Sequence, residues 1–271
     1  MIRERGFTLT ELLITMVVMA ILGSALARLL ISNSRFVSRQ DAMMSARESS
    51  RAAMNTMVAE LRLVPNGGLR VASRDSVRAR IPLAFGLLCG SSGGQTVASL
   101  LPYDSVMYAS ATLDSLAWLD STLTYRPVGN FTVSSSSAQA VCDVDSIKVV
   151  PGGQLIALSR PNIGQPGAIF HLYQTVTYRF ANSVEMPGRH ALWRRTTAAA
   201  EEIVAPFDTS ARFLFLLGPG LTPSTTVPAV LDSVRGLELK LVGASDFAPQ
   251  GQTTYQTFPL STHVAFLNRK E

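Results

Sequence analysis

The chain has 271 residues, which is long enough for one large domain or two small ones together with an extended element. Hydrophobic residues make up 47% of it and charged residues 16%, so the composition is that of a folded chain and excludes a disordered one. The formal net charge is +5, and arginine carries almost all of the positive charge.

An apolar run follows the first six residues and extends from residue 7 to residue 27. About 20 helical residues at 1.5 Å each span roughly 30 Å, which matches the hydrocarbon core of a bilayer. Arg3 and Arg5 precede the run and favour a cytoplasmic N-terminus. We therefore predict a helix that crosses the membrane once, with the rest of the chain outside the cytoplasm.

Glu11 distinguishes the interpretations of this apolar run. A secretory signal peptide would be cut after Ala27, where Ala25-Leu26-Ala27 offers a small-x-small site. A plain membrane anchor would keep the whole run. Both interpretations leave a carboxylate inside an apolar segment, where it costs several kcal/mol. Neither of them gives Glu11 a role.

A third interpretation comes from the segment Arg-Gly-Phe-Thr-Leu-Thr-Glu-Leu-Leu at residues 5–13. This segment closely resembles the class III signal of the type IV pilin superfamily, which includes pilins, type II secretion pseudopilins and competence pilins. The resemblance implies that a prepilin peptidase removes residues 1–6 by cutting between Gly6 and Phe7. It also implies N-methylation of Phe7. Glu11 then becomes the fifth residue of the mature chain, where the family has a glutamate.

Cleavage would create a partner for Glu11, because it frees the α-amino group of Phe7. A carboxylate in a bilayer or in a filament core needs such a partner. The amine lies about one helical turn away in the same chain, and it can also belong to the next subunit of a filament. We therefore predict that Glu11 sets the register between subunits; the alternative is a glutamate merely tolerated near the membrane interface.

The helical pattern continues from residue 28 to residue 64 as an amphipathic segment. Gly23-Ser24 is a soft point at which the helix could bend. Pro65 and the two glycines that follow it predict the end of the helix. An apolar stripe is expected to pack on the globular part of the same chain: Met43, Ala46, Met54, Met57, Val58 and Leu61.

Beyond residue 68 the pattern changes to short alternating runs, which predict half-buried antiparallel strands. In one run Val176 and Tyr178 fall on one side, and Thr177 and Arg179 fall on the other. We predict an α+β fold in which the long helix packs on an antiparallel sheet. Residues 69–150 are expected to be a variable region or an insertion, and residues 151–271 a β-rich pilin-like domain. The clearest runs are Gln174–Phe180, Val234–Val242 and Thr262–Phe266.

The order of these runs resembles the PilW-like minor pilins and the J-type minor pseudopilins. The closing pair, Asn268-Arg269, departs from their pattern. The resemblance implies a minor subunit of a type IV pilus or of a type II secretion pseudopilus, at the tip or as an assembly primer. Its implied partners are the prepilin peptidase/methyltransferase, other subunits, the inner-membrane assembly platform and, before assembly, membrane lipid. It would reside in the bacterial inner membrane and then in a periplasmic or cell-surface filament.

Ten arginines lie between Arg28 and Arg80, and this basic stretch supports a different function. The simpler interpretation is a solvated helix face whose partners come from neighbouring subunits. The alternative is a DNA-binding competence pilin, in which the arginines meet phosphates. That alternative would use Arg70, Arg74, Arg78 and Arg80.

The two cysteines, Cys89 and Cys142, lack the C-x-x-C spacing of a metal site. In an oxidising compartment we expect them to form one disulfide, whereas in the cytosol they would be two buried thiols. Asp143 and Asp145 are too few for a Ca²⁺ site, and we expect them on the solvent face of a strand.

An enzyme is not indicated by any motif. Residues 90–94 satisfy G-x-S-x-G, but no helix start follows them, so we expect a flexible loop. The three histidines have no recognisable catalytic setting: His171, His190 and His263. No P-loop, dinucleotide fingerprint or H-E-x-x-H motif is present. We predict a structural subunit without cofactor or metal.

Overall fold

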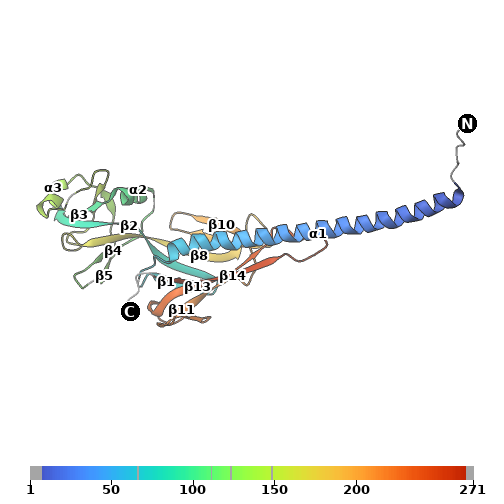
Figure 1. Ribbon diagram of the computed structural model, residues 1–271. Coiled ribbons are helices and arrows are strands. Elements are labelled where there is room, and N and C mark those ends of the chain that lie inside the picture. Colours follow the sequence, from blue (N-terminus) through green and yellow to red (C-terminus); the bar gives the residue numbers. More distant parts are fainter. Residues whose placement is uncertain (1–7, 66, 111, 123, 148, 267–271) are drawn as a thin grey trace, which may run out of the picture.

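A computed structural model describes residues 8–65, 67–110, 112–122, 124–147 and 149–266. One long helix, α1 (Leu9–Leu61), leads into a β-rich body, and its N-terminal half stands clear of that body (Figure 1). The 53 residues of α1 correspond to a length of roughly 80 Å. The predicted α+β class, with a long N-terminal helix on an antiparallel sheet, is confirmed.

The helix is continuous through Gly23 and ends three residues earlier than the pattern suggested. Its last turn tightens, because the Leu63 amide donates to the Glu60 carbonyl at 3.0 Å and the Val64 amide to the Leu61 carbonyl at 3.2 Å. Pro65 disfavours a helical conformation for the residue before it. The chain therefore leaves the helix before Val64.

All described strands belong to one 14-stranded sheet, and every pairing in it is antiparallel. The strands are β1 (Leu69–Ala72), β2 (Ser76–Ser92), β3 (Gln95–Leu100), β4 (Ser115–Leu119), β5 (Tyr125–Val128), β6 (Val133–Ser135), β7 (Gln154–Leu158), β8 (Ile169–Asn182), β9 (His190–Arg195), β10 (Ala200–Phe207), β11 (Arg212–Leu217), β12 (Thr222–Ser224), β13 (Val234–Ala244) and β14 (Thr257–Ala265). The main order is β12-β11-β13-β10-β9-β8-β2-β3-β7-β6, with β1 on β2, β14 on β13, and β4 between β5 and β8.

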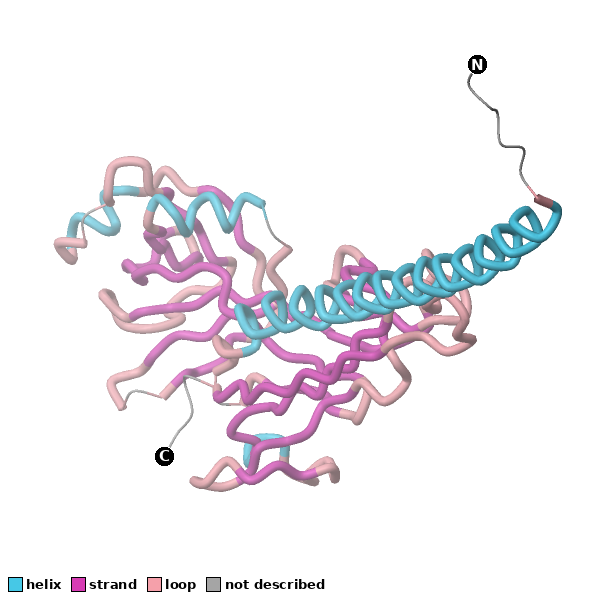
Figure 2. Tube along the Cα trace, turned by 45° about the vertical axis from the view of Figure 1, so that its right-hand side comes forward, coloured by secondary structure: helices cyan, strands magenta, loops and turns pink. Residues whose placement is uncertain are grey.

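Among the described residues, two large apolar cores lie along this sheet, and a third, small cluster surrounds the disulfide. The first contains Met57 of α1 together with Tyr178 and Leu239, so it joins the helix to the sheet. The second contains Leu88 and Phe170 and lies beyond the helix end, where α2 (Pro102–Ser110) covers the strands. The strands β2 and β8 are long enough to run through both parts (Figure 2).

The regions before and after residue 150 share the sheet. β2 pairs with β8 from Ser76 opposite Arg179 to Leu87 opposite Ile169. A division of the chain at residue 150 stays a prediction. The three predicted strand runs fall in β8, β13 and β14, although β14 ends at Ala265, one residue before the predicted end.

Two local predictions from the sequence are wrong. The segment 90–94 is not a flexible loop, because β2 continues to Ser92 and turns into β3 at Gly93-Gly94. Both glycines have positive φ angles, 57° and 78°, as a tight two-residue hairpin requires. Asp143 does not lie on a strand: it belongs to α3 (Gln139–Val144), which the disulfide at Cys142 ties to β2.

Candidate assembly helix and an arginine groove on the sheet

Thr8 and Glu11 together form the N-terminal cap of α1. The Glu11 amide donates to the Thr8 hydroxyl at 3.3 Å, and the Thr8 amide donates to a Glu11 carboxylate oxygen at 3.0 Å. The Thr8 hydroxyl also donates to that oxygen at 2.9 Å. These bonds satisfy amide groups that a helix start leaves without partners.

The sequence analysis missed the role of Thr8, although the signal was present. Thr8-Leu9-Thr10-Glu11 fits the capping-box pattern Ser/Thr-x-x-Glu. The predicted cleavage and methylation residues, Gly6 and Phe7, lie outside the described residues. The described part of the chain therefore gives the Glu11 carboxylate a local partner, and its predicted pairing with the Phe7 amine stays a prediction.

Past Glu11, α1 carries no charge until Arg28, and its surface is apolar and exposed on all sides. Leu9 is 82% exposed and Met19 is 72% exposed. The most apolar 18-residue window of α1 has a mean hydropathy of 2.2, and none of it is buried in the body. An apolar helix of this length and composition suits a bilayer or the core of a helical assembly.

Residues 1–27 match the family model of the prokaryotic N-terminal methylation motif. This chain is type IV pilin-like. Such a subunit is processed by prepilin peptidase and is structural rather than enzymatic, and its apolar helix is consistent with membrane anchoring before assembly. Comparisons with curated proteins and with solved structures found no match.

The second half of the pilin-like helix docks on the sheet through small residues. Ala46 and Ser50 are fully buried, and Gly243 of β13 lies directly against them. The Gly243 amide donates to the Ser50 hydroxyl at 2.8 Å, and that hydroxyl donates to the Phe258 carbonyl at 3.0 Å. A Cβ on Gly243 would lie 2.1 Å from the Ala46 carbonyl oxygen, so the two backbones approach too closely for any side chain.

The predicted apolar stripe is only partly buried. Ala46, Met57 and Leu61 pack on the body, whereas Met54 and Val58 are half-buried and Met43 is exposed. The buried residues also recur at spacings of three and four, but they begin at Ala42 rather than Met43. Met43, Met54 and Val58 therefore lie at the edge of the buried face. The residues buried along α1 are Ala42, Ala46, Ser49, Ser50, Ala53, Met57 and Leu61.

A polar cluster fixes the last turns of the helix. Glu60 accepts hydrogen bonds from Arg194 of β9 at 2.9 Å and from the Tyr178 hydroxyl of β8 at 2.7 Å. Burial, and then the adjacent Glu60 carboxylate, raise the pKa of Tyr178 far above its ordinary value. The hydroxyl therefore stays protonated and keeps donating to Glu60.

Cys89 of β2 and Cys142 of α3 are joined by a disulfide. Both half-cystines are buried, together with Val97 and Leu155, in a small apolar cluster of their own. The loop that the disulfide closes spans 53 positions of the sequence. It holds α3 against the edge of the second core, where the helix has only six residues and no side-chain cap of its own.

The four arginines of the DNA-binding alternative do not meet at one place. Arg74 lines a small pocket with Arg212 on the β11 side, whereas Arg78 lies near the start of β2, opposite Thr177 of β8. Burial, and then the positive charge of Arg70, lower the pKa of Arg80. Only Arg78 lines the larger groove that is present on the sheet.

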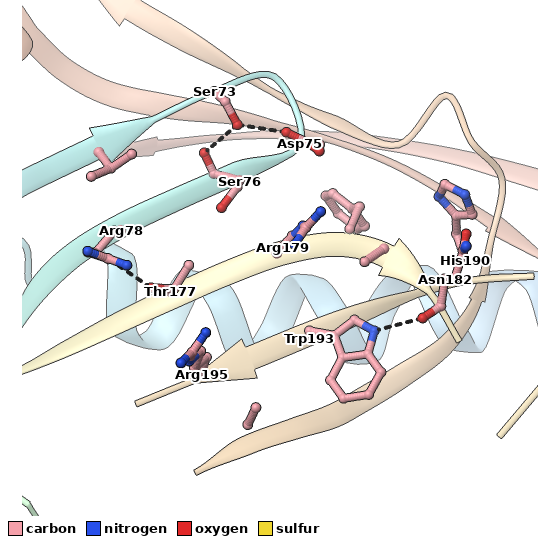
Figure 3. Close-up of a pocket in the computed structure, with 14 residues that line it drawn as sticks. Ser73, Asp75, Ser76, Arg78, Thr177, Arg179, Asn182, His190, Trp193 and Arg195 are labelled. Carbon is pink, nitrogen blue, oxygen red and sulfur yellow. Dashed lines mark hydrogen bonds between the residues drawn. The ribbon is translucent and has the colours of Figure 1, made fainter. Parts of the chain in front are cut away.

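That groove has a volume of about 910 Å³ and crosses strands β1, β2, β8, β9 and β10 (Figure 3). Arg78, Arg179 and Arg195 line it together with Trp193 and His190. The sequence pattern had placed Arg179 on the outer side of its strand, but it gave no sign that Arg195 and Trp193 would lie next to it. Their proximity results from the pairing of β8 with β9.

The three histidines lie in separate places. His190 lines the groove, and His263 lies 3.6 Å from the Glu238 carboxylate. His171 packs among aromatic rings, including Tyr125 at 5.2 Å, and burial lowers its pKa. Within the described ranges, no three His, Cys, Asp or Glu side chains gather closely enough to hold a metal ion.

Proposed function

We propose that this protein is a minor subunit of a type IV pilus or of a type II secretion pseudopilus, which acts at the tip or as an assembly primer. Before assembly it would sit in the inner membrane with its N-terminus in the cytoplasm. After cleavage between Gly6 and Phe7 and methylation of Phe7, its helix would join the helices of other subunits. The assembly platform would drive that transfer.

One observation carries the tip position. The part of the body built from β3, β4 and α3 extends beyond the C-terminal end of α1 (Figure 1). In a filament with a core of parallel N-terminal helices, this part would point away from the membrane. It would occupy the space where the body of the next subunit stands. A subunit of this shape fits best where no subunit follows it.

The large body also favours a sparse subunit over a major one. More than two hundred residues follow the membrane segment, and the described ones build two large apolar cores rather than one. Every turn of a filament made of this subunit would have to accommodate both parts. A single copy at the tip avoids that packing problem.

The experiment combines gene deletion with quantitative proteomics of sheared filaments. Deletion should reduce or abolish filaments, and in the wild type this protein should be far rarer than the major subunit. Finding it as the dominant component would overturn the minor-subunit proposal. Unchanged filament number after deletion would overturn the priming role.

Processing is tested separately with Gly6→Val, since a peptidase that needs close access to the backbone favours a residue without a side chain. We expect the variant to accumulate as a full-length precursor in the membrane. Mass spectrometry of the wild type should find N-methylated Phe7 at the N-terminus. A mature chain that begins at Arg28 would instead support a secretory signal peptide.

A further inference from the structure

The lining of the sheet groove follows a regular cross-strand arrangement. In one row Arg78 of β2 lies opposite Thr177 of β8, which lies opposite Arg195 of β9. In the next row on the same face, Arg179 lies opposite Trp193. Neighbouring strands are about 4.8 Å apart, and alternate residues of one strand are about 7 Å apart. The Cα atoms of the three arginines therefore form a triangle with sides of roughly 8–10 Å.

This triangle carries positive charge without counter-ions. Among the residues that the structure describes, none of the three guanidinium groups has a carboxylate within ion-pair distance. The Arg78 Nε donates to the Thr177 hydroxyl at 3.3 Å. Among the described residues, the two terminal nitrogens of Arg78 have no acceptor, so they can bind a ligand. Asp75 stands at the rim and accepts from the Ser73 hydroxyl at 2.7 Å. Such a set of donors suits an anionic ligand.

Trp193 gives the groove a flat apolar surface beside the arginines. Its indole N–H donates to the Asn182 carbonyl at 3.2 Å, which fixes the ring in place. Figure 3 shows the ring broadside, below Arg179 and to the right of Arg195, with α1 behind the strands. The groove therefore lies on the face of the sheet opposite the helix, which a helix-centred assembly would leave open to the surroundings.

We propose that the groove binds a short stretch of an acidic polysaccharide, with sugar carboxylates on the arginines and a sugar ring on Trp193. A volume of about 910 Å³ is that of a site for a ligand of several rings. The hydroxyls of Ser76 and Thr177 lie between the charged groups and match the hydroxyls of a sugar chain. This inference does not depend on the proposed place of the subunit in a filament.

One feature favours a polysaccharide over nucleic acid. Sites for single-stranded nucleic acid stack successive bases on several aromatic rings along a continuous basic track. Here Trp193, which is half-buried, is the one large ring that the described lining residues present to the groove, because Phe180 is buried in the first core.

Calorimetric titration of the full chain in non-ionic detergent would test this proposal. The probes are tetragalacturonate, its methyl ester, a 12-nucleotide single strand and a 12-base-pair duplex. We expect the tetragalacturonate to bind and the methyl ester, which keeps the rings but loses the charge, to bind at least about tenfold more weakly. Arg179→Gln and Arg195→Gln should each weaken tetragalacturonate binding by about tenfold or more.

The controls separate a specific site from general charge. Arg160→Gln removes the same charge from an exposed position outside the groove, and it should change binding by less than about twofold. Arg179→Lys keeps the charge but loses the two-pronged donor, so it should bind more weakly than the wild type. The proposal is overturned if tetragalacturonate does not bind, if Arg179→Gln and Arg160→Gln weaken it equally, or if an oligonucleotide binds more tightly through the same arginines. The last result would assign the groove to nucleic acid.

Discussion

The Tyr178 hydroxyl donates a hydrogen bond of 2.7 Å to Glu60, so the central strand β8 holds the last turn of the long helix directly. Arg194 binds the same carboxylate at 2.9 Å. Replacing Glu60 by Leu would leave a half-buried guanidinium and a buried hydroxyl without their acceptor. We expect it to lower the free energy of unfolding by about 2 kcal/mol.

Thermal unfolding in detergent, followed by circular dichroism, measures this loss. Glu48→Leu is the matched control, because Glu48 lies on the same helix and is exposed. It should change the free energy of unfolding by less than about 0.5 kcal/mol. Equal effects of the two substitutions would show that the cluster at Glu60 does not stabilise the docking of the helix.

The raised pKa of Tyr178 predicts a loss of stability at alkaline pH. In the unfolded chain this tyrosine ionises near pH 10, whereas burial and Glu60 keep it protonated in the folded chain. Above pH 10 the unfolded state therefore binds fewer protons, and the free energy of unfolding falls as the pH rises. The contribution of the Tyr178 hydroxyl to the free energy of unfolding is fully present below pH 10 and declines above it.

Tyr178→Phe should reduce this alkaline dependence. Between pH 10 and pH 11.5, urea titrations should give a slope that is smaller than that of the wild type by up to about 1.4 kcal/mol per pH unit. Burial also raises the pKa of Tyr173, so a residual slope should remain. An unchanged slope in Tyr178→Phe would contradict the assignment.

The fold class was predictable because its signals are local in the sequence. The apolar run, the stop at Pro65 and the alternation around Tyr178 each reflect periodicity within one element. The helix cap was also readable, since Thr8 and Glu11 are three residues apart. Asp143 was assigned to the wrong element because short alternating runs fit a strand and a single helical turn equally well.

The groove was not predictable, because it depends on strand order. Arg78 and Arg195 are 117 positions apart, and only the pairings of β8 with β2 and with β9 bring them to one face. Periodicity assigns a residue to a side of its strand but says nothing about which strand lies beside it. The contact of Gly243 with Ser50 was not predictable either, because it depends on how α1 packs on β13 and the two residues are far apart in the chain.

Gly243→Ala should impair the docking of α1. The new Cβ would lie 2.1 Å from the Ala46 carbonyl oxygen and 2.5 Å from the Ser50 hydroxyl, so the helix would have to move away from β13. Overpacking against backbone costs about 3 kcal/mol in such cases. Gly129→Ala is the control, because nothing lies within 4 Å of its Cβ position. Similar unfolding midpoints for the two variants would contradict the close approach.

The disulfide predicts that protein from its native compartment has no free thiol. Titration under denaturing conditions should find no reactive thiol before reduction and two after it. Reduction opens a loop of 53 positions and should lower the free energy of unfolding by about 4 kcal/mol in the chain-entropy model. Two free thiols in the unreduced protein would show that Cys89 and Cys142 are not joined there.

Glu11 has two separable roles, and a pair of substitutions distinguishes them. Glu11→Gln keeps a side chain that can complete the capping box with Thr8 but removes the negative charge. Thr8→Ala removes the cap hydroxyl and leaves the charge in place.

If pairing with the Phe7 amine sets the register, Glu11→Gln should be cleaved normally yet enter filaments poorly, whereas Thr8→Ala should assemble like the wild type. Immunoblotting of membrane and sheared filament fractions, with mass spectrometry of the N-terminus, measures both steps. The opposite result, an assembly defect in Thr8→Ala alone, would assign Glu11 to the helix cap and leave no role for its charge between subunits.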